Sequence, residues 1–107
     1  MKVVAIIQAR MGSTRLPGKV LMDLGGYPVL EWVVRACEHA PGVDDVWVAT
    51  STLPADDKIE QFCDDRGINC FRGSETDVLA RVHGAAVAAQ ADIVLRITGD
   101  CPFVDPQ

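Results

Sequence analysis

Strand-like and helix-like segments alternate along this chain, and that alternation constrains its fold more than any other feature. Four short apolar runs are expected to be strands, at residues 2–7, 44–50, 68–73 and 92–98. Segments with a helical period follow the first three runs, at residues 28–40, 53–67 and 74–90. The first run, KVVAII, shows no polar alternation, which is typical of a strand buried on both faces. Since right-handed crossovers join strands that alternate with helices, we expect an α/β fold with a mostly parallel sheet and flanking helices.

The size and charge of the chain narrow the class of protein. Its 107 residues are enough for one small domain with a core. The net charge of −5 argues against a nucleic-acid partner, which would need a broad basic face. No apolar run is long enough to span a membrane or to form a signal-peptide core, so we expect no membrane partner. The four cysteines lack the spacing of a metal site, which favours reduced thiols and a cytoplasmic location.

The positive charge of the chain is concentrated at its start. Residues 1–22 hold four Lys or Arg and no Asp or Glu, whereas the rest holds six basic and fifteen acidic residues. Three of the cations, Arg10, Arg15 and Lys19, lie in the segment ARMGSTRLPGK (9–19, here the first loop), directly after the first strand. Arginine binds phosphate oxygens bidentately and lysine supplies a compact charge, so this loop is a candidate phosphate site.

The glycines of the first loop fit no standard phosphate-binding motif. Gly12 and Gly18 are separated by five residues and Val20 follows Lys19, whereas a P-loop has four residues between its glycines and Ser or Thr after its lysine. Glycines still allow successive backbone N–H groups to turn toward an anion. The alternative is a solvated basic loop in which the glycines serve only as turns.

Other candidate residues also follow strands. In open α/β sheets, ligands bind beyond the carboxyl ends of the strands. Thr50 and Ser51 lie at the carboxyl end of the second predicted strand, and Asp100 follows the fourth in the segment RITGDCP. A carboxylate at that place commonly binds Mg²⁺, but it can equally be a turn residue that accepts hydrogen bonds from its own backbone.

The third predicted helix opens with SETDVLAR (74–81). Ser74 and Asp77 have the spacing of a capping box, with Asp in place of Glu, and Arg81 follows Asp77 at the i,i+4 spacing of an ion pair. A cap and an ion pair therefore explain these residues without any ligand. His39 and His83 lack a partner at metal-ligand spacing, and we expect both to be solvated.

Four motifs, taken together in order and spacing, resemble a known family. They are ARMGSTRLPGKVL, VATS, GSETDVLARV and RITGDCPFVDP. The chain resembles the cytidylyltransferase-like family of spore-coat polysaccharide biosynthesis proteins, which is related to the acylneuraminate and 3-deoxy-manno-octulosonate cytidylyltransferases. The resemblance implies a Rossmann-like nucleotidyltransferase that joins CTP to a sugar with Mg²⁺ and releases pyrophosphate. The segment around TGDCP differs from that of the sugar-acid enzymes, so the acceptor sugar does not carry over.

The resemblance also assigns roles to individual residues. It implies that the triphosphate is held by the first loop, through Arg10, Gly12, Ser13, Arg15 and Lys19. It places a strand-end segment, Ala49, Thr50 and Ser51, near the base and ribose, and the helix residues Asp77 and Arg81 near the base. It also implies that Asp100 binds the metal. Of these, we expect Arg15, Lys19 and Asp100 to take part in the chemistry.

Members of this family are typically longer than this chain. The final residues VDPQ read as the start of a helix, with Asp105 as its N-cap and Pro106 in its first turn. We therefore expect residues 1–107 to be the N-terminal, nucleotide-binding part of a nucleotidyltransferase domain. The resemblance implies that the remaining half supplies the acceptor pocket, a second metal ligand and a homo-oligomer interface.

Two other functions stay open from the sequence. One is a glycosyltransferase of the related nucleotide-sugar fold, although such enzymes usually carry Asp-x-Asp at their metal and the strand-end loops here do not. The other is a non-catalytic nucleotide-binding module of a larger biosynthetic protein.

Overall fold

A parallel sheet forms the centre of the molecule. The structure, a computed structural model, describes residues 1–12 and 19–98. The strands lie in the order β5–β4–β1–β6, and every neighbouring pair is parallel. Their bounds are Val3–Gln8 for β1, Asp45–Ser51 for β4, Asn69–Gly73 for β5 and Ile93–Thr98 for β6. The predicted α/β fold is confirmed, and each strand begins and ends within one residue of its predicted range.

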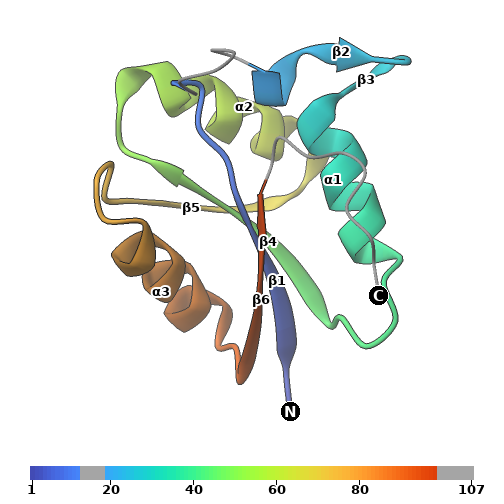
Figure 1. Ribbon diagram of the computed structural model, residues 1–107, viewed down its shortest axis with the longest axis vertical. Coiled ribbons are helices and arrows are strands. Elements are labelled where there is room, and N and C mark those ends of the chain that lie inside the picture. The colour runs from blue at the N-terminus through green and yellow to red at the C-terminus, as the bar shows by residue number, and fades with distance from the viewer. Residues whose placement is uncertain (13–18, 99–107) are drawn as a thin grey trace.

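Helices cover both faces of this sheet. The helices α1 (Val29–Glu38) and α2 (Asp57–Arg66) pack on one face, and α3 (Val78–Ala89) packs on the other (Figure 1). The first strand β1 contributes to both cores: Ala5 and Ile7 pack with α1 and α2, and Val4 and Ile6 pack with α3. Burial of each Val or Ile contributes about 1.5–3 kcal/mol, so the unbroken apolar run of β1 is a main source of stability.

The helix ends follow local sequence signals with small shifts. Gly67 caps α2 in the left-handed conformation at φ 69°, which glycine adopts at the C-termini of many helices. Pro28 is the N-cap of α1 and not its first helical residue. The short 3-10 turn η2 (Pro54–Asp56) replaces the first turn of the predicted helix at 53–67. Within the described residues, no helix combines the length and the hydropathy that crossing a bilayer requires.

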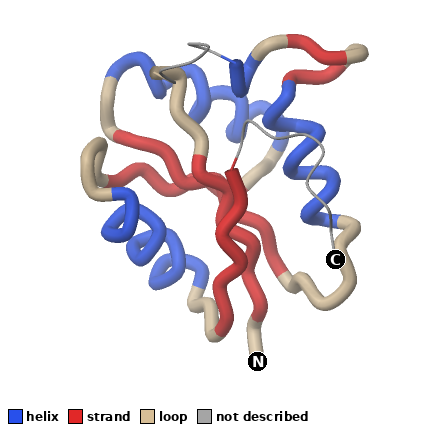
Figure 2. Tube along the Cα trace, in the orientation of Figure 1, coloured by secondary structure: helices blue, strands red, loops and turns tan. Residues whose placement is uncertain are grey.

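A small hairpin separates the first loop from α1. The 3-10 turn η1 (Lys19–Leu21) leads into β2 (Asp23–Leu24) and β3 (Tyr27–Pro28), which pair antiparallel (Figure 2). Gly25 and Gly26 form the turn with φ values of 65° and 101°, which is where glycine is needed. The two short strands of this hairpin were not among the predicted strands.

The strand order reverses at β1. From β1 the chain adds β4 and then β5 on one side, and then crosses to place β6 on the other side of β1. Ligands of open α/β sheets bind outside the carboxyl ends of the strands near such a reversal. A ligand-binding site is therefore expected at the edge of the sheet where β1 and β4 end.

Candidate functional site

Three segments meet at the carboxyl edge of the sheet. The ends of β1 and β4 are joined there by a hydrogen bond of 3.1 Å from the Ala9 N–H to the Ala49 carbonyl. One residue later, Arg10 turns toward the segment that precedes α3, and its Nη1 donates to the Glu75 carbonyl at 3.4 Å. The start of the first loop and the end of β4 therefore lie together, as the rule for carboxyl ends predicted, and the segment before α3 joins them. The segment after the fourth strand lies outside the described residues.

Arg81 lies buried at this meeting point. Its side chain comes from the first turns of α3, the residue is only 2% exposed, and its Nη1 donates to the Ser74 carbonyl at 3.1 Å. Its Nε has no hydrogen-bond partner in the part of the chain that the structure describes. Burial and the neighbouring Arg10 guanidinium lower the pKa of Arg81, and Asp56 offsets part of this effect. Two guanidinium groups and an unused donor thus lie together, which is an arrangement that an anion would stabilise.

The predicted strand-end residues Ala49, Thr50 and Ser51 are all fully buried. The Thr50 hydroxyl has no hydrogen-bond partner among the described residues. The Ser51 hydroxyl, in contrast, donates to the Asp56 carboxylate and accepts from the Leu53 N–H at 3.1 Å. Of the two hydroxyls, only that of Thr50 is left for a further contact.

The start of α3 differs from the predicted capping box. Asp77 is itself the N-cap, and its carboxylate accepts from the Ala80 N–H at 3.0 Å. The Ser74 hydroxyl accepts from the Asp77 N–H at 3.0 Å, so Ser74 stabilises the turn before the helix and does not cap it. The prediction of Ser74 as the cap is wrong, because the helix begins at Val78.

The predicted ion pair of Asp77 with Arg81 is also wrong. No ion pair found among residues 1–12 and 19–98 joins the two side chains. The Asp77 carboxylate stays exposed at the cap, whereas Arg81 is directed to the Ser74 carbonyl and away from solvent. The i,i+4 rule describes exposed helix faces, and Arg81 lies on a buried one.

Several predicted site residues lie outside the described residues or are described only in part. Ser13, Arg15 and Asp100 belong to the segments that the structure does not describe. Gly12 is described and exposed, and Lys19 begins η1 but its side chain is not described. The assignment of these residues to a ligand therefore stays a prediction.

Sequence reasoning missed two residues of this edge. Asp56 is 1% exposed, and its Oδ1 accepts from the Met11 N–H at 2.7 Å, where the first loop begins. Arg72, at the end of β5, donates from its Nε to the Ser51 carbonyl at 2.8 Å. The sequence shows Asp56 only as one of two adjacent aspartates at the start of a helix, which is a common pattern that carries no signal of a buried contact.

The described residues supply no metal site. No group of three or more His, Cys, Asp or Glu side chains that could hold an ion occurs among them. Both carboxylate oxygens of Asp56 accept hydrogen bonds from protein groups, so this carboxylate is not available as a ligand. A carboxylate such as that of Asp100 has the right chemistry for Mg²⁺, but Asp100 lies outside the described residues.

Comparison with known protein families shows which family this chain belongs to. Residues 4–107 match the family described as cytidylyltransferase. The chain belongs to this family. Its parallel sheet with flanking helices is also that of solved nucleotidyltransferases with a Rossmann-like fold, so the fold and the family implied by the four motifs are both confirmed.

Individual relatives agree with the family. The chain is 43% identical over 109 residues to the spore coat polysaccharide biosynthesis protein SpsF of Bacillus subtilis, a match that covers 98% of this chain and 45% of the relative. A cytidylyltransferase structure from Leptospira borgpetersenii superposes with a TM-score of 0.90 at 40% identity, over 99% of this chain and 44% of the other. A CMP:2-keto-3-deoxy-manno-octonic acid synthetase solved in complex with CTP gives a TM-score of 0.80 at 31% identity, over 99% and 43%. The chain thus spans less than half the length of these relatives.

Proposed function

We propose that this chain is the nucleotide-binding part of a cytidylyltransferase, which activates a sugar with CTP and releases pyrophosphate in polysaccharide biosynthesis. The observation that carries the proposal is the cationic pair of Arg10 and the buried Arg81 at the carboxyl edge of the sheet. Membership of the cytidylyltransferase family and the relation to a spore-coat polysaccharide protein support the choice of CTP and of a sugar.

The described residues suit an anionic ligand. The Nε of Arg81 has no hydrogen-bond partner among the described residues. Burial and the nearby charge of Arg10 both disfavour the charged form of Arg81. A phosphate group placed between the two guanidinium groups would accept from that donor and reduce their repulsion. The first loop would add the side chains of Arg15 and Lys19, so that a triphosphate meets several cations at once.

The proposed chemistry is a direct displacement. A sugar hydroxyl attacks the α-phosphorus of CTP, a new oxygen–phosphorus bond forms, and the bond to the bridging oxygen of pyrophosphate breaks with its electron pair. The hydroxyl proton is released to solvent or to a base outside the described residues. The role of Arg15 and Lys19 in this step is to stabilise the charge that develops on pyrophosphate, since such transfers depend on positioning and electrostatics.

We further propose Asp100 as the residue that holds a divalent cation. Mg²⁺ prefers carboxylate and phosphate oxygens, and when bound it would neutralise charge on the phosphates. In the full-length protein, Asp100→Asn keeps the shape of the side chain but removes its charge. We expect loss of Mg²⁺-dependent turnover with little change in melting temperature, and retained Mg²⁺-dependent turnover would contradict the metal role.

The triphosphate assignment is tested by comparing two nucleotides. Arg15→Ala and Lys19→Ala each remove a charge-assisted contact of about 1.5–3 kcal/mol, which is roughly a ten- to hundredfold loss of affinity. Calorimetry should show this loss for CTP and a much smaller one for CMP. Lys58→Ala, which removes an exposed lysine on α2, is the matched control and should change neither affinity. Equal losses for CTP and CMP would contradict contacts with the β- and γ-phosphates.

Nucleotide binding without turnover is the second candidate for these 107 residues. It is favoured by the fact that the chain covers less than half the length of its relatives. Incubation with CTP, Mg²⁺ and a panel of sugars, followed by measurement of pyrophosphate, separates the two: turnover requires sugar-dependent release, and a binding module shows CTP affinity alone.

The proposed setting is the cytoplasm, with a homo-oligomer as the full-length form. Cys37, Cys63 and Cys70 carry free thiols, which fits a reducing compartment. Fractionation of cells and light scattering of the full-length protein test these two proposals.

A further inference from the structure

The position of Asp56 suggests a helix cap, but its side chain does something else. Asp56 is the N-cap residue of α2, where an aspartate usually accepts a hydrogen bond from the first turn of its own helix. Its carboxylate makes no such bond, and the residue is only 1% exposed. A buried carboxylate that does not cap its own helix needs another explanation, because burial of a charge is unfavourable unless other groups compensate for it.

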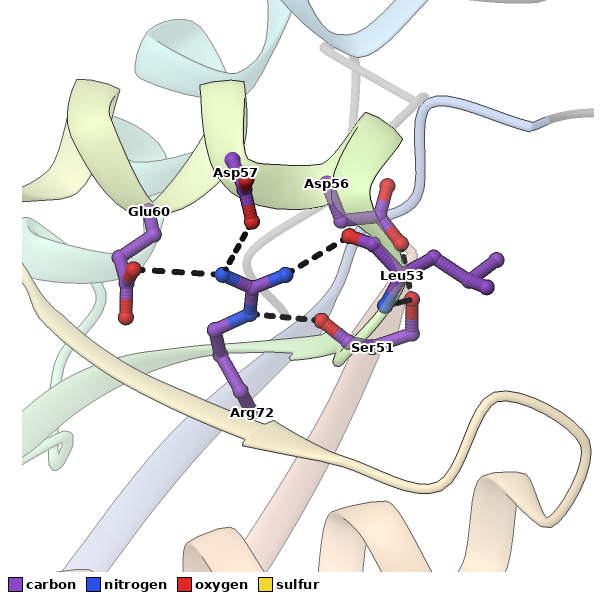
Figure 3. Close-up of polar contacts among 6 residues, drawn as sticks. All are labelled: Ser51, Leu53, Asp56, Asp57, Glu60 and Arg72. Atoms are coloured by element: carbon purple, nitrogen blue, oxygen red, sulfur yellow. Dashed lines mark hydrogen bonds and ion pairs between the residues drawn. The ribbon is translucent and has the colours of Figure 1, made fainter.

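The Asp56 carboxylate joins two segments that are far apart in sequence. Its Oδ1 accepts from the Met11 N–H at 2.7 Å, across 45 residues of chain. Its Oδ2 accepts from the Ser51 hydroxyl at the end of β4 (Figure 3). One carboxylate therefore fixes the start of the first loop relative to the end of β4.

Arg72 holds the turn that presents Asp56. From β5 its Nε and Nη2 donate to the carbonyls of Ser51 and Leu53, each at 2.8 Å. Its Nη1 pairs with the carboxylates of Asp57 and Glu60 at 2.7 and 3.2 Å (Figure 3). The turn between β4 and α2 is thus tied at its backbone and at the first turn of the helix, so Asp56 has little freedom to move.

The charge of Asp56 excludes a direct role as a ligand for phosphate. A carboxylate in contact with a triphosphate would repel it. The two Asp56 carboxylate oxygens instead accept hydrogen bonds from the Met11 N–H and the Ser51 hydroxyl. Because the Met11 N–H donates to Asp56, it is not free to bind an anion. Asp56 therefore acts on the first loop from within the protein.

We propose that Asp56, held in place by Arg72, is a positioning residue that sets the start of the first loop, at Met11, against the end of β4 and so prepares both segments for CTP. This inference rests on the proposed function, since it assumes that the first loop binds CTP. By this inference, Asp56, a buried residue outside the first loop, influences the affinity of the protein for CTP.

The test compares Asp56→Ala and Asp56→Asn with a matched control. Glu31→Gln also neutralises a buried acid with two polar partners, but Glu31 pairs with Arg35 and Arg66 between α1 and α2. For each variant, NMR hydrogen exchange reports the Met11 amide in the ligand-free protein, calorimetry reports the CTP dissociation constant, and thermal denaturation reports global stability. Arg72→Lys serves as a second route if Asp56→Ala does not fold, because lysine keeps the charge but lacks the planar fork of donors with which Arg72 reaches two carbonyls and two carboxylates.

We expect Asp56→Ala to raise both the Met11 exchange rate and the CTP dissociation constant by about tenfold or more. Asp56→Asn should raise the Met11 exchange rate and the CTP dissociation constant less than Asp56→Ala does, because the asparagine amide oxygen can still accept from the Met11 N–H. Arg72→Lys should change both in the same direction, and Glu31→Gln should change only the stability. Unchanged Met11 exchange in Asp56→Ala, or an equal loss of CTP affinity in Glu31→Gln, would overturn the inference. Failure of the unaltered chain to bind CTP would instead overturn the proposed function, while Met11 exchange would still decide whether Asp56 fixes the loop.

Discussion

Replacement of Arg81 by methionine should make the ligand-free protein more stable while it weakens nucleotide binding. Methionine keeps an unbranched apolar stem of similar length, so the packing of Arg81 beside Gly73 can be retained. What it removes is a guanidinium that is 2% exposed, lies near Arg10 and leaves its Nε without a partner among the described residues. A buried charge that lacks partners until its ligand binds should lower the free energy of unfolding of the ligand-free protein.

The magnitude follows from two opposing terms. Loss of the 3.1 Å hydrogen bond to the Ser74 carbonyl is unfavourable, but Ser74 is exposed, so water can replace the donor. Removal of a buried donor without a partner is worth about 1–3 kcal/mol, and replacement of buried ionic groups by apolar ones is often neutral or stabilising by about 1–4 kcal/mol. We expect a net gain of about 1 kcal/mol, which for a domain of this size raises the melting temperature by about 4–8 °C.

Arg72→Met is the matched comparison for this experiment. The Arg72 side chain is also mostly buried, with 17% of its surface exposed, but its guanidinium is fully engaged by two carbonyls and two carboxylates. Its removal should destabilise the protein by about 2 kcal/mol, because the carbonyls of Ser51 and Leu53 lose their donor.

The assay is thermal denaturation with and without CTP, together with calorimetry. Arg81→Met should raise the melting temperature of the free protein and largely abolish its increase on addition of CTP, since ligand stabilisation follows affinity. A fall in melting temperature as large as that of Arg72→Met, with CTP affinity unchanged, would refute the reasoning and make Arg81 a structural residue.

Three further predictions concern stability. The hydrogen bond from Arg66 holds the pKa of Glu31 below its usual value, so the stability this pair adds is present at neutral pH and is lost as the pH falls through that lowered pKa. In urea denaturation, Glu31→Gln should therefore be less stable than the unaltered chain at about pH 7 and nearly equal to it at about pH 2–3. A Cβ on Gly84 would lie 2.5 Å from the Phe71 ring, so Gly84→Ala should destabilise by about 1–2 kcal/mol despite the better helix propensity of alanine, and a smaller residue at position 71 should relieve the effect. Gln90 caps α3 at φ 56°, so Gln90→Gly should stabilise by about 0.5–1 kcal/mol in the same assay, and a loss of stability would contradict a strained cap.

The fold could be predicted from the sequence because its signals are local and repeated. The unbroken apolar run of β1 predicted a buried strand, and the helical period of residues 53–67 predicted α2, whose residues Ile59, Phe62 and Cys63 are buried. Such patterns depend on neighbouring residues only. The start of α3 was predicted wrongly because Ser74 and Asp77 can both cap a helix. In the structure the Asp77 carboxylate accepts from the Ala80 N–H, and the Ser74 hydroxyl accepts from the Asp77 N–H.

The candidate site was predicted only in part, for the same physical reason. The position of Arg10 after a strand, and the rule for carboxyl ends, were enough to place the start of the first loop at this edge of the sheet. Asp56 and Asp57 are chemically identical neighbours in the sequence, and nothing local shows that the first turns inward to Met11 while the second pairs with Arg72. That difference is set by contacts between segments 45 and 15 residues apart, which composition and spacing do not record.

The central place of β1 has a consequence for the order in which the molecule assembles. Strand β1 precedes the other strands of the sheet in the sequence, yet one of its two edges pairs with β6, and the Lys2 N–H donates to the carboxylate of Asp92, 90 residues downstream. The contacts of Arg10, Met11, Ser51 and Asp56 need only segments that precede α3 or belong to it, so they can form while that edge is still open. Pulse-labelled hydrogen exchange during refolding should therefore show protection at Met11 before protection along β6, so that the contacts that position Arg10 and Met11 form before the sheet is complete.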